Sequence, residues 1–178
     1  MPLRLTLVTG GARSGKSQFA EALARGRGPN VVYLATGSAG DLEMRRRIAA
    51  HRRRRPATWR TIEAACGLAS AVDSAAGPMD AIVLDDIGFL LTNLLGDEPV
   101  SMGQVERQLR QEERALWSTV SRPGVPLIAV TNEVGSGLVP VTPLGRVFRD
   151  LLGRCNQRWA ARSESVYLLV AGQALRIK

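Results

Sequence analysis

The sequence predicts an α/β fold in which a mostly parallel central sheet is flanked by helices. Short apolar runs alternate along the chain with helix-like segments, which is the rhythm of strands joined by crossover helices. A glycine-rich segment follows the first apolar run and precedes a stretch of good helix formers. That order of strand, loop and helix is typical of a P-loop nucleotide-binding fold. At 178 residues the chain fits one such domain, spanning 1–178.

Five apolar runs are predicted to be strands, because each is short and bounded by turn-forming residues. They span residues 3–9, 31–35, 81–84, 127–131 and 166–170. Helices are expected at 41–54, 87–95, 102–121 and 144–162, with a further helix beginning near Ser17. In the two longest, apolar side chains recur at helical spacing, so one face of each should pack on the sheet. Those side chains are Val105, Leu109, Leu116 and Val120 in the first, and Leu144, Val147, Phe148, Leu151, Cys155 and Trp159 in the second.

The glycine-rich segment after the first strand matches the pattern G-x-x-x-x-G-K-[ST]. Its residues are Gly10, Gly11, Ala12, Arg13, Ser14, Gly15, Lys16 and Ser17. Glycines let backbone N–H groups turn toward phosphate oxygens, and the helix that follows adds the positive end of its dipole. Lys16 is expected to reach the β- and γ-phosphates, and Ser17 to place its hydroxyl on Mg²⁺. The segment therefore predicts a nucleoside triphosphate site.

A pair of acids follows the third predicted strand. Asp85 comes directly after the run 81–84, and a carboxylate at the C-terminal end of a buried strand lies near the phosphate loop in such sheets. Asp85 is the predicted partner of Ser17 at Mg²⁺, with a solvated strand-end acid as the alternative. Asp86 is expected to cap the helix at 87–95.

Composition narrows the class of partner. Lys and Arg number 24 against 16 Asp and Glu, and a net charge of +8 suits an anionic ligand or a nucleic acid. Aromatic residues make up only 4% of the chain, so a small phosphorylated ligand is favoured over a polynucleotide. No apolar run is long enough to span a membrane and no secretory signal is recognised, so a cytoplasmic location is expected. Cys66 and Cys155 have the spacing of neither a metal site nor a disulfide framework, and both are expected to be buried.

Much of the positive charge gathers around His51, the one histidine of the sequence. Seven arginines flank it: Arg45, Arg46, Arg47, Arg52, Arg53, Arg54 and Arg55. If 41–54 is helical, Met44 and Ile48 form its buried stripe and His51 lies on a neighbouring face. Positive neighbours disfavour the imidazolium, and a neutral imidazole among arginines suits attack on phosphorus. A solvated basic helix face explains the same residues without chemistry, and the residues alone leave both interpretations open.

Two segments in the C-terminal half carry a likeness to a known family. Residues 131–135 read TNEVG with GLVP at 137–140, and residues 146–150 read RVFRD, followed by Gly153, Asn156 and Gln157. Together with the phosphate loop and the YLAT segment at 33–36, they make the chain similar to the bifunctional adenosylcobinamide kinase/adenosylcobinamide-phosphate guanylyltransferases of cobalamin biosynthesis. The likeness covers nearly the whole chain, and generic phosphate-loop kinases lack both segments.

The resemblance implies roles for individual residues. In that family the guanylylated histidine is followed by a proline and a Trp-Arg-Thr stretch, and here Pro56 and residues 59–61 follow His51 in that way. His51 is thereby implied to be the covalent nucleophile. The same matching implies guanine-nucleotide contacts at Ala35, Thr36, Gly37, Arg52, Arg53, Arg54, Arg55, Glu63 and Asp85. A carboxylate such as Glu63 accepts hydrogen bonds from guanine N1–H and the exocyclic amine, a geometry that adenine cannot satisfy.

The implied chemistry has two steps. The γ-phosphoryl group of ATP or GTP passes to the aminopropanol hydroxyl of adenosylcobinamide, which requires Lys16, Mg²⁺ and Asp85. His51 then attacks the α-phosphorus of GTP, and the phosphate of adenosylcobinamide phosphate displaces it to give adenosylcobinamide-GDP. The resemblance also implies a homo-oligomer such as a trimer, with the triphosphate and the corrinoid as small-molecule partners.

Two other classes of function stay open on the sequence. An ordinary P-loop metabolite kinase would use residues 10–17 and leave His51 on a helix surface. A nucleic-acid-dependent ATPase would use the arginine cluster as its binding face, and its polynucleotide binding would depend steeply on salt.

Overall fold

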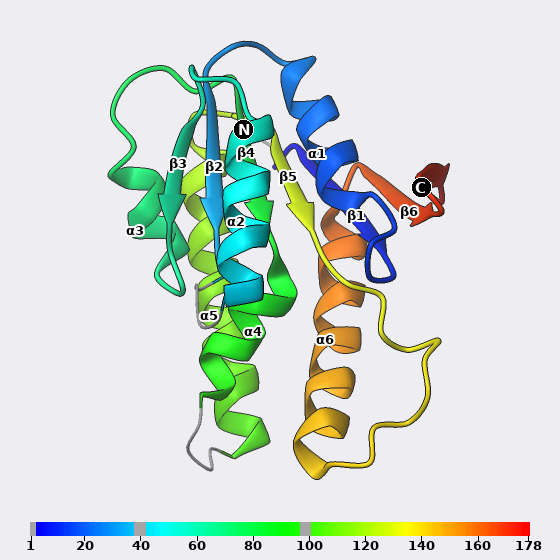
Figure 1. The fold of residues 1–178 in the computed structure, drawn as a ribbon. Coiled ribbons are helices and arrows are strands. Elements are labelled where there is room, and N and C mark those ends of the chain that lie inside the picture. The colour runs from blue at the N-terminus through cyan, green and yellow to red at the C-terminus, as the bar shows by residue number, and fades with distance from the viewer. Residues whose placement is uncertain (1–2, 38–41, 97–100) are drawn as a thin grey trace.

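A seven-stranded sheet runs through the described part of the protein, which is residues 3–37, 42–96 and 101–178 of a computed structural model. The strand order is β3-β2-β4-β5-β1-β6-β7, and all neighbouring strands are parallel except β6 and β7. The strands are β1 (Leu5–Gly10), β2 (Val31–Ala35), β3 (Arg60–Glu63), β4 (Ala81–Asp85), β5 (Leu127–Val130), β6 (Ser165–Val170) and β7 (Gln173–Arg176). The predicted α/β fold with a mostly parallel sheet is confirmed (Figure 1).

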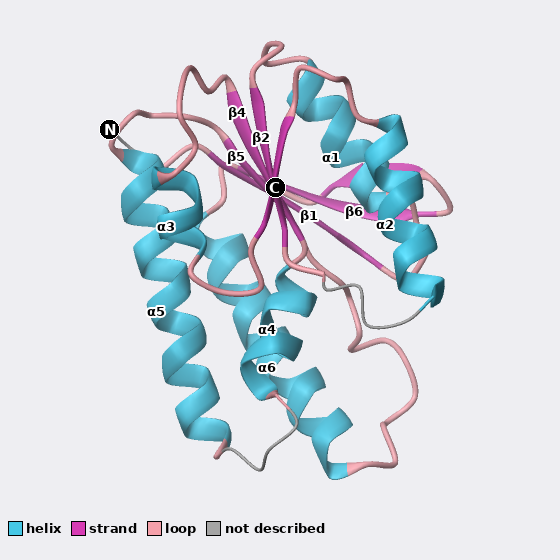
Figure 2. Cartoon of the chain, turned by 60° about the vertical axis from the view of Figure 1, so that its left-hand side comes forward, coloured by secondary structure: helices cyan, strands magenta, loops and turns pink. Residues whose placement is uncertain are grey.

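Helices cover both faces of this sheet. They are α1 (Lys16–Arg25), α2 (Leu42–Arg54), α3 (Leu68–Asp73), α4 (Ile87–Leu95), α5 (Met102–Ser121) and α6 (Pro143–Arg162). Figure 2 shows α1 and α2 on one side of the sheet and the other four helices on the opposite side. The helices predicted from periodicity are all present, and their ends differ from the prediction by at most one residue.

Alternate residues of each central strand pack into opposite cores. In β2, Val32 and Leu34 join the core beneath α3 to α6, whereas Val31 and Tyr33 join the core beneath α1. These four side chains are at most 1% exposed. Burial on both faces explains why the central strands appear in the sequence as continuous apolar runs.

The two long helices pack largely as their periodicity predicts. The four apolar residues expected on the buried face of α5 are all fully buried. In α6, Leu151, Cys155 and Trp159 are buried, but Leu144 is 58% exposed. The prediction for Leu144 is wrong because the first turn of α6 extends past the sheet (Figure 1).

Three short elements were not predicted: β3, α3 and β7. Strand β3 has the sequence RTIE and lies at one edge of the sheet, so it lacks an apolar run. All four residues of strand β7 are exposed, and the strand pairs antiparallel with β6 through the two-residue turn Ala171-Gly172, in which both residues have positive φ. Helix α3 has only six residues, too few to show a period.

Two further expectations concern exposure. Cys155 is buried as predicted, but Cys66 is exposed, because it lies in the connection between β3 and α3. Within the described ranges, no helix combines the length and hydrophobicity needed to cross a membrane.

A buried acid joins the two long helices. Glu113 of α5 is 2% exposed and accepts hydrogen bonds from the Arg158 guanidinium at 2.8 and 2.9 Å. It also accepts from Trp159 Nε1 at 3.2 Å and from Cys155 Sγ at 3.0 Å. Because the carboxylate has this many donors, its burial is compensated only while α5 and α6 stay together.

Replacing this acid should therefore weaken the fold. We expect Glu113→Ala to lower the free energy of unfolding by about 3 kcal/mol, because it leaves the half-buried Arg158 without its main partner. Urea unfolding followed by circular dichroism measures the change. Glu164→Ala, at an exposed acid, is the control and should change stability by less than about 0.5 kcal/mol. Equal effects of the two substitutions would contradict the assigned role of Glu113.

Candidate active site

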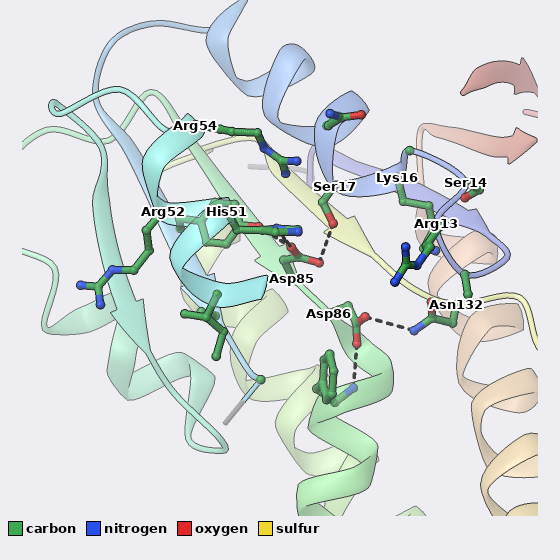
Figure 3. A pocket seen from close by; sticks show the side chains of 18 of the residues that line it. Arg13, Ser14, Lys16, Ser17, His51, Arg52, Arg54, Asp85, Asp86 and Asn132 are labelled. Carbon is green, nitrogen blue, oxygen red and sulfur yellow. Dashed lines mark hydrogen bonds and ion pairs between the residues drawn. The ribbon is translucent and has the colours of Figure 1, made fainter. Parts of the chain in front are cut away.

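A cavity of about 640 Å³ opens where β1, β2, β4 and β5 end. Ligands bind at the carboxyl ends of the strands in open parallel sheets, because the loops that leave these ends converge there. Figure 3 shows Lys16 and Asn132 on one side of the cavity, His51 and Arg52 on the other, and Asp85 between them.

Most of the predicted site residues line this one cavity. Those that do are Ala12, Arg13, Ser14, Gly15, Lys16, Ser17, Ala35, Gly37, His51, Arg52, Arg54, Arg55, Glu63 and Asp85. Four do not: Gly10, Gly11, Thr36 and Arg53. The side chains of Met44 and Arg47, expected on the buried stripe and the basic face of α2, lie outside the described part of the chain.

Backbone geometry explains the first glycine of the phosphate loop. Gly10 has a φ of 150°, and a Cβ added there would lie 2.4 Å from the carbonyl oxygen of Leu169, so no larger residue fits. The carbonyl of Gly11 accepts a 2.6 Å hydrogen bond from Lys16 Nζ. On the β6–β7 side, the N–H of Gly172 donates to the carbonyl of Ser14 at 3.0 Å. The loop is thus braced from behind while its front faces the cavity.

The end of β4 places a carboxylate at the centre of the cavity. Asp85 Oδ1 accepts a 3.3 Å hydrogen bond from Ser17 Oγ, and Asp85 Oδ2 accepts one from the hydroxyl of Tyr33. The pKa of Tyr33 is raised by burial first and by the nearby Asp85 second, so this phenol remains a proton donor.

Ser17 and Asp85 have the oxygen atoms needed to bind Mg²⁺. The described residues contain no cluster of three His, Cys, Asp or Glu side chains able to hold a metal by themselves. Mg²⁺ commonly uses one or two protein oxygens and completes its shell with water and phosphate oxygens. The Ser17 hydroxyl and the Asp85 carboxylate, side by side beneath the phosphate loop, match that requirement.

Asp86 has a structural role at the cavity floor. Its Oδ1 accepts from the N–H of Phe89 at 2.7 Å, which confirms the predicted N-cap of α4. Its Oδ2 accepts from Asn132 Nδ2 at 3.0 Å. The buried hydroxyl of Thr36 exchanges hydrogen bonds with the backbone N–H and carbonyl of Asp86, so Thr36 joins β2 to β4 instead of facing the cavity.

His51 projects from the last turn of α2 toward Asp85. Its Nδ1 lies 3.9 Å from Asp85 Oδ2. The pKa of His51 is lowered mainly by burial, while Asp85 raises it and Arg54 lowers it. The direction agrees with the predicted neutral imidazole, but the larger cause is lost hydration and not the positive neighbours.

Each arginine after His51 has a different environment. Arg52 pairs with Glu63 at 3.6 Å, and both side chains are largely exposed. Arg54 pairs with the buried Glu21 at 3.4 Å. Arg55 places its guanidinium carbon 3.4 Å from the centre of the Tyr33 ring, which is a cation–π contact. Arg53 is exposed and does not line the cavity.

Comparison with known proteins decides the family. A family model described as cobinamide kinase/cobinamide phosphate guanyltransferase matches residues 6–177. The chain belongs to this family. The bifunctional adenosylcobalamin biosynthesis protein CobU of Salmonella typhimurium is 43% identical over 181 residues, covering 98% of this chain and 99% of the relative. CobU of Escherichia coli is 39% identical with the same coverage, and CobP of Pseudomonas aeruginosa is 43% identical over 97% of this chain and 96% of its own length. The resemblance inferred from the sequence is confirmed.

The cavity also contains residues to which the sequence analysis gave no site role. They include Tyr33, Thr61, Phe89, Asn132, Glu133 and Val134. Asn132 and Glu133 directly follow the predicted strand at 127–131, as Asp85 and Asp86 follow the predicted strand at 81–84. The rule that selected Asp85 would therefore have selected them. Tyr33 and Phe89 lie within regular elements and carried no comparable signal.

The one histidine of the sequence makes its ionisation directly measurable. In the untagged, nucleotide-free protein, the single imidazole signal in a proton NMR titration should have a midpoint below pH 6.5, because burial disfavours the imidazolium. The unfolded protein in urea is the control and should titrate near pH 6.5. A folded midpoint at or above the unfolded one would contradict the assigned environment.

Asp86 should make stability depend on pH. Burial first and Asp85 second raise its pKa from 3.8 to about 6, so between these values the folded state holds a proton that the unfolded state releases. The free energy of unfolding should therefore fall as pH rises from 4 to 6, by about 2 kcal/mol from this group. Urea unfolding of wild type and Asp86→Asn at pH 4, 5 and 6 measures it. A stability difference between the two proteins that stays constant with pH would refute this assignment.

Proposed function

We propose that this protein catalyses both reactions named in its family: phosphorylation of adenosylcobinamide by ATP or GTP, and transfer of GMP from GTP to adenosylcobinamide phosphate. The observation that carries the proposal is the position of His51. It lines the same cavity as Lys16 and Ser17 and lies 3.9 Å from the carboxylate that Ser17 contacts. A single bound triphosphate thus has its phosphate cradle and a neutral nucleophile within one cavity.

In the kinase step, the phosphate loop and Lys16 hold the β- and γ-phosphates while the acceptor hydroxyl attacks the γ-phosphorus and loses its proton. The bond from that phosphorus to the β–γ bridging oxygen breaks, and its electron pair leaves with the nucleoside diphosphate. Ser17 and Asp85 are the residues that would hold Mg²⁺, which when bound offsets charge on the phosphate oxygens. The main contribution of the protein is to orient the reacting groups, because phosphoryl transfer needs little covalent assistance.

In the transferase step, an imidazole nitrogen of His51 forms a bond to the α-phosphorus of GTP. The bond from that phosphorus to the bridging oxygen breaks, and its electron pair leaves with pyrophosphate. A phosphate oxygen of adenosylcobinamide phosphate then attacks the same phosphorus, and the N–P bond breaks to restore the imidazole. Arg52, Arg54 and Arg55 lie where they offset the negative charge that gathers in both transition states.

Guanine selection is assigned to Glu63, which lines the cavity. Glu63 at the end of β3 presents a largely exposed carboxylate, and only Arg52 contacts it among the ion pairs of the described residues. A carboxylate there can accept from both guanine donors, N1–H and the exocyclic amine. This supports GTP as the guanylyl donor.

The other functions considered fit the structure less well. A metabolite kinase without the transferase step gives no reason for His51 to line the cavity. A polynucleotide-binding face needs arginines turned outward, and two of the cluster, Arg54 and Arg55, are instead engaged by Glu21 and Tyr33. A homo-oligomer such as a trimer belongs to the proposal, and exposed apolar side chains in the connection between β5 and α6, at Leu138, Val139 and Val141, support an interface.

The proposal predicts that His51→Ala separates the two reactions. With GTP labelled at the α-phosphorus, wild type should acquire acid-labile, alkali-stable label, and His51→Ala should acquire none because it has no nucleophile. Phosphorylation of adenosylcobinamide should stay within about threefold of wild type. Lys16→Ala, which removes contacts to the β- and γ-phosphates, is the comparison and should weaken both reactions. Label on the His51→Ala protein would remove His51 from the mechanism, and unlabelled wild type would refute the transferase assignment.

A further inference from the structure

One face of α1 extends from the phosphate loop to the end of α2. Ser17, Glu21 and Arg25 follow one another at four-residue spacing, so they lie on the same side of the helix. Ser17 contacts Asp85, while Glu21 and Arg25 both contact Arg54. This face therefore connects the triphosphate cradle to the helix that carries His51.

Glu21 is a buried acid for which the proposed reactions give no use. It is 3% exposed, and its Oε1 lies 3.4 Å from Arg54 Nη2. A buried carboxylate is costly to keep charged unless a cation stays beside it. Glu21 thus strongly favours one position of the Arg54 guanidinium, at the wall of the cavity.

Arg54 is also held through its backbone. Its carbonyl oxygen, at the C-terminal end of α2, accepts a 2.8 Å hydrogen bond from Arg25 Nη2. A cation at this position also complements the negative end of the helix dipole. His51 lies three residues before Arg54, which places both within the last turn of the helix.

A second attachment holds the chain just beyond the helix. Arg55 lies over the ring of Tyr33 in β2 and donates to Thr61 Oγ1 of β3 at 3.1 Å. The segment with His51 is therefore fixed to the sheet on one side and to α1 on the other. Of these two attachments, only the one to α1 links the segment with His51 to the helix that begins in the phosphate loop.

We propose that Glu21 is a positioning residue for guanylyl transfer, acting through Arg54 to hold the last turn of α2, and with it His51, against the phosphate cradle. The inference rests on the proposed function, because it assumes that His51 attacks the α-phosphorus.

The two reactions should depend on Glu21 to different degrees. Attack by His51 requires the imidazole to sit within bonding reach of the α-phosphorus, and small displacements of a nucleophile reduce rates strongly. Transfer of the γ-phosphoryl group uses Lys16, Ser17 and Asp85, none of which contacts Arg54 in the hydrogen bonds and ion pairs of the described residues. A loss of overall folding would lower both rates together.

The test is Glu21→Gln, which keeps the size of the side chain and removes its charge. Single-turnover transfer of label from α-labelled GTP to the protein should slow about tenfold or more, while kcat for adenosylcobinamide phosphorylation stays within about threefold. Glu106→Gln, at an acid of α5 that pairs with Arg110, is the matched control and should leave both rates unchanged. Equal loss of both reactions, or loss of neither, would overturn the proposal.

A double-mutant cycle tests whether the effect passes through Arg54. The Arg54 side chain is partly exposed. Arg54→Gln should therefore leave the core intact even if Glu21→Gln, at a buried position, disturbs it. The combined Glu21→Gln/Arg54→Gln protein should label no more slowly than the slower single variant, whereas multiplied effects would overturn the coupling. If wild type acquires no label, the proposed function is refuted. If wild type and Glu21→Gln acquire label equally fast, only this inference is refuted.

Discussion

The carboxylate of Asp85 is the point at which the parts of the site meet. Tyr33 and Ser17 donate to its two oxygens, and His51 faces it from α2. Each of these partners comes from a different element, and β4 brings the carboxylate to the middle of the sheet edge where they converge. One acid therefore serves as the common reference for the phosphate loop, the second strand and the histidine-bearing helix.

Burial and charge have distinct effects in this cavity. Lost hydration is the largest influence on the pKa of His51, Tyr33 and Asp86, and it favours the uncharged form of each. The arginines are distributed so that Arg54 and Arg55 are already engaged by Glu21 and by the Tyr33 ring. A bound triphosphate thus meets cations whose positions are set beforehand, which lowers the reorganisation that catalysis requires.

The sequence was most informative where a residue type has one physical explanation. The phosphate loop, the central strands and the long helices follow from glycine geometry and apolar period, and the structure has them within two residues of the predicted bounds. Strand β3 was missed because RTIE at a sheet edge has no apolar pattern. Thr36 was expected at the nucleotide, but its hydroxyl joins β2 to β4, a long-range contact that no local pattern encodes. The attachment of Arg54 to Glu21 was missed for the same reason.

The brace behind the phosphate loop has a consequence for synthesis of the protein. The loop is complete by Ser17, but Gly10 packs against Leu169, and Gly172 donates to Ser14. A chain emerging from the ribosome cannot make these contacts until the β6–β7 turn has been translated. Nucleotide capture by the nascent chain should therefore begin late, after nearly every other strand of the sheet is available.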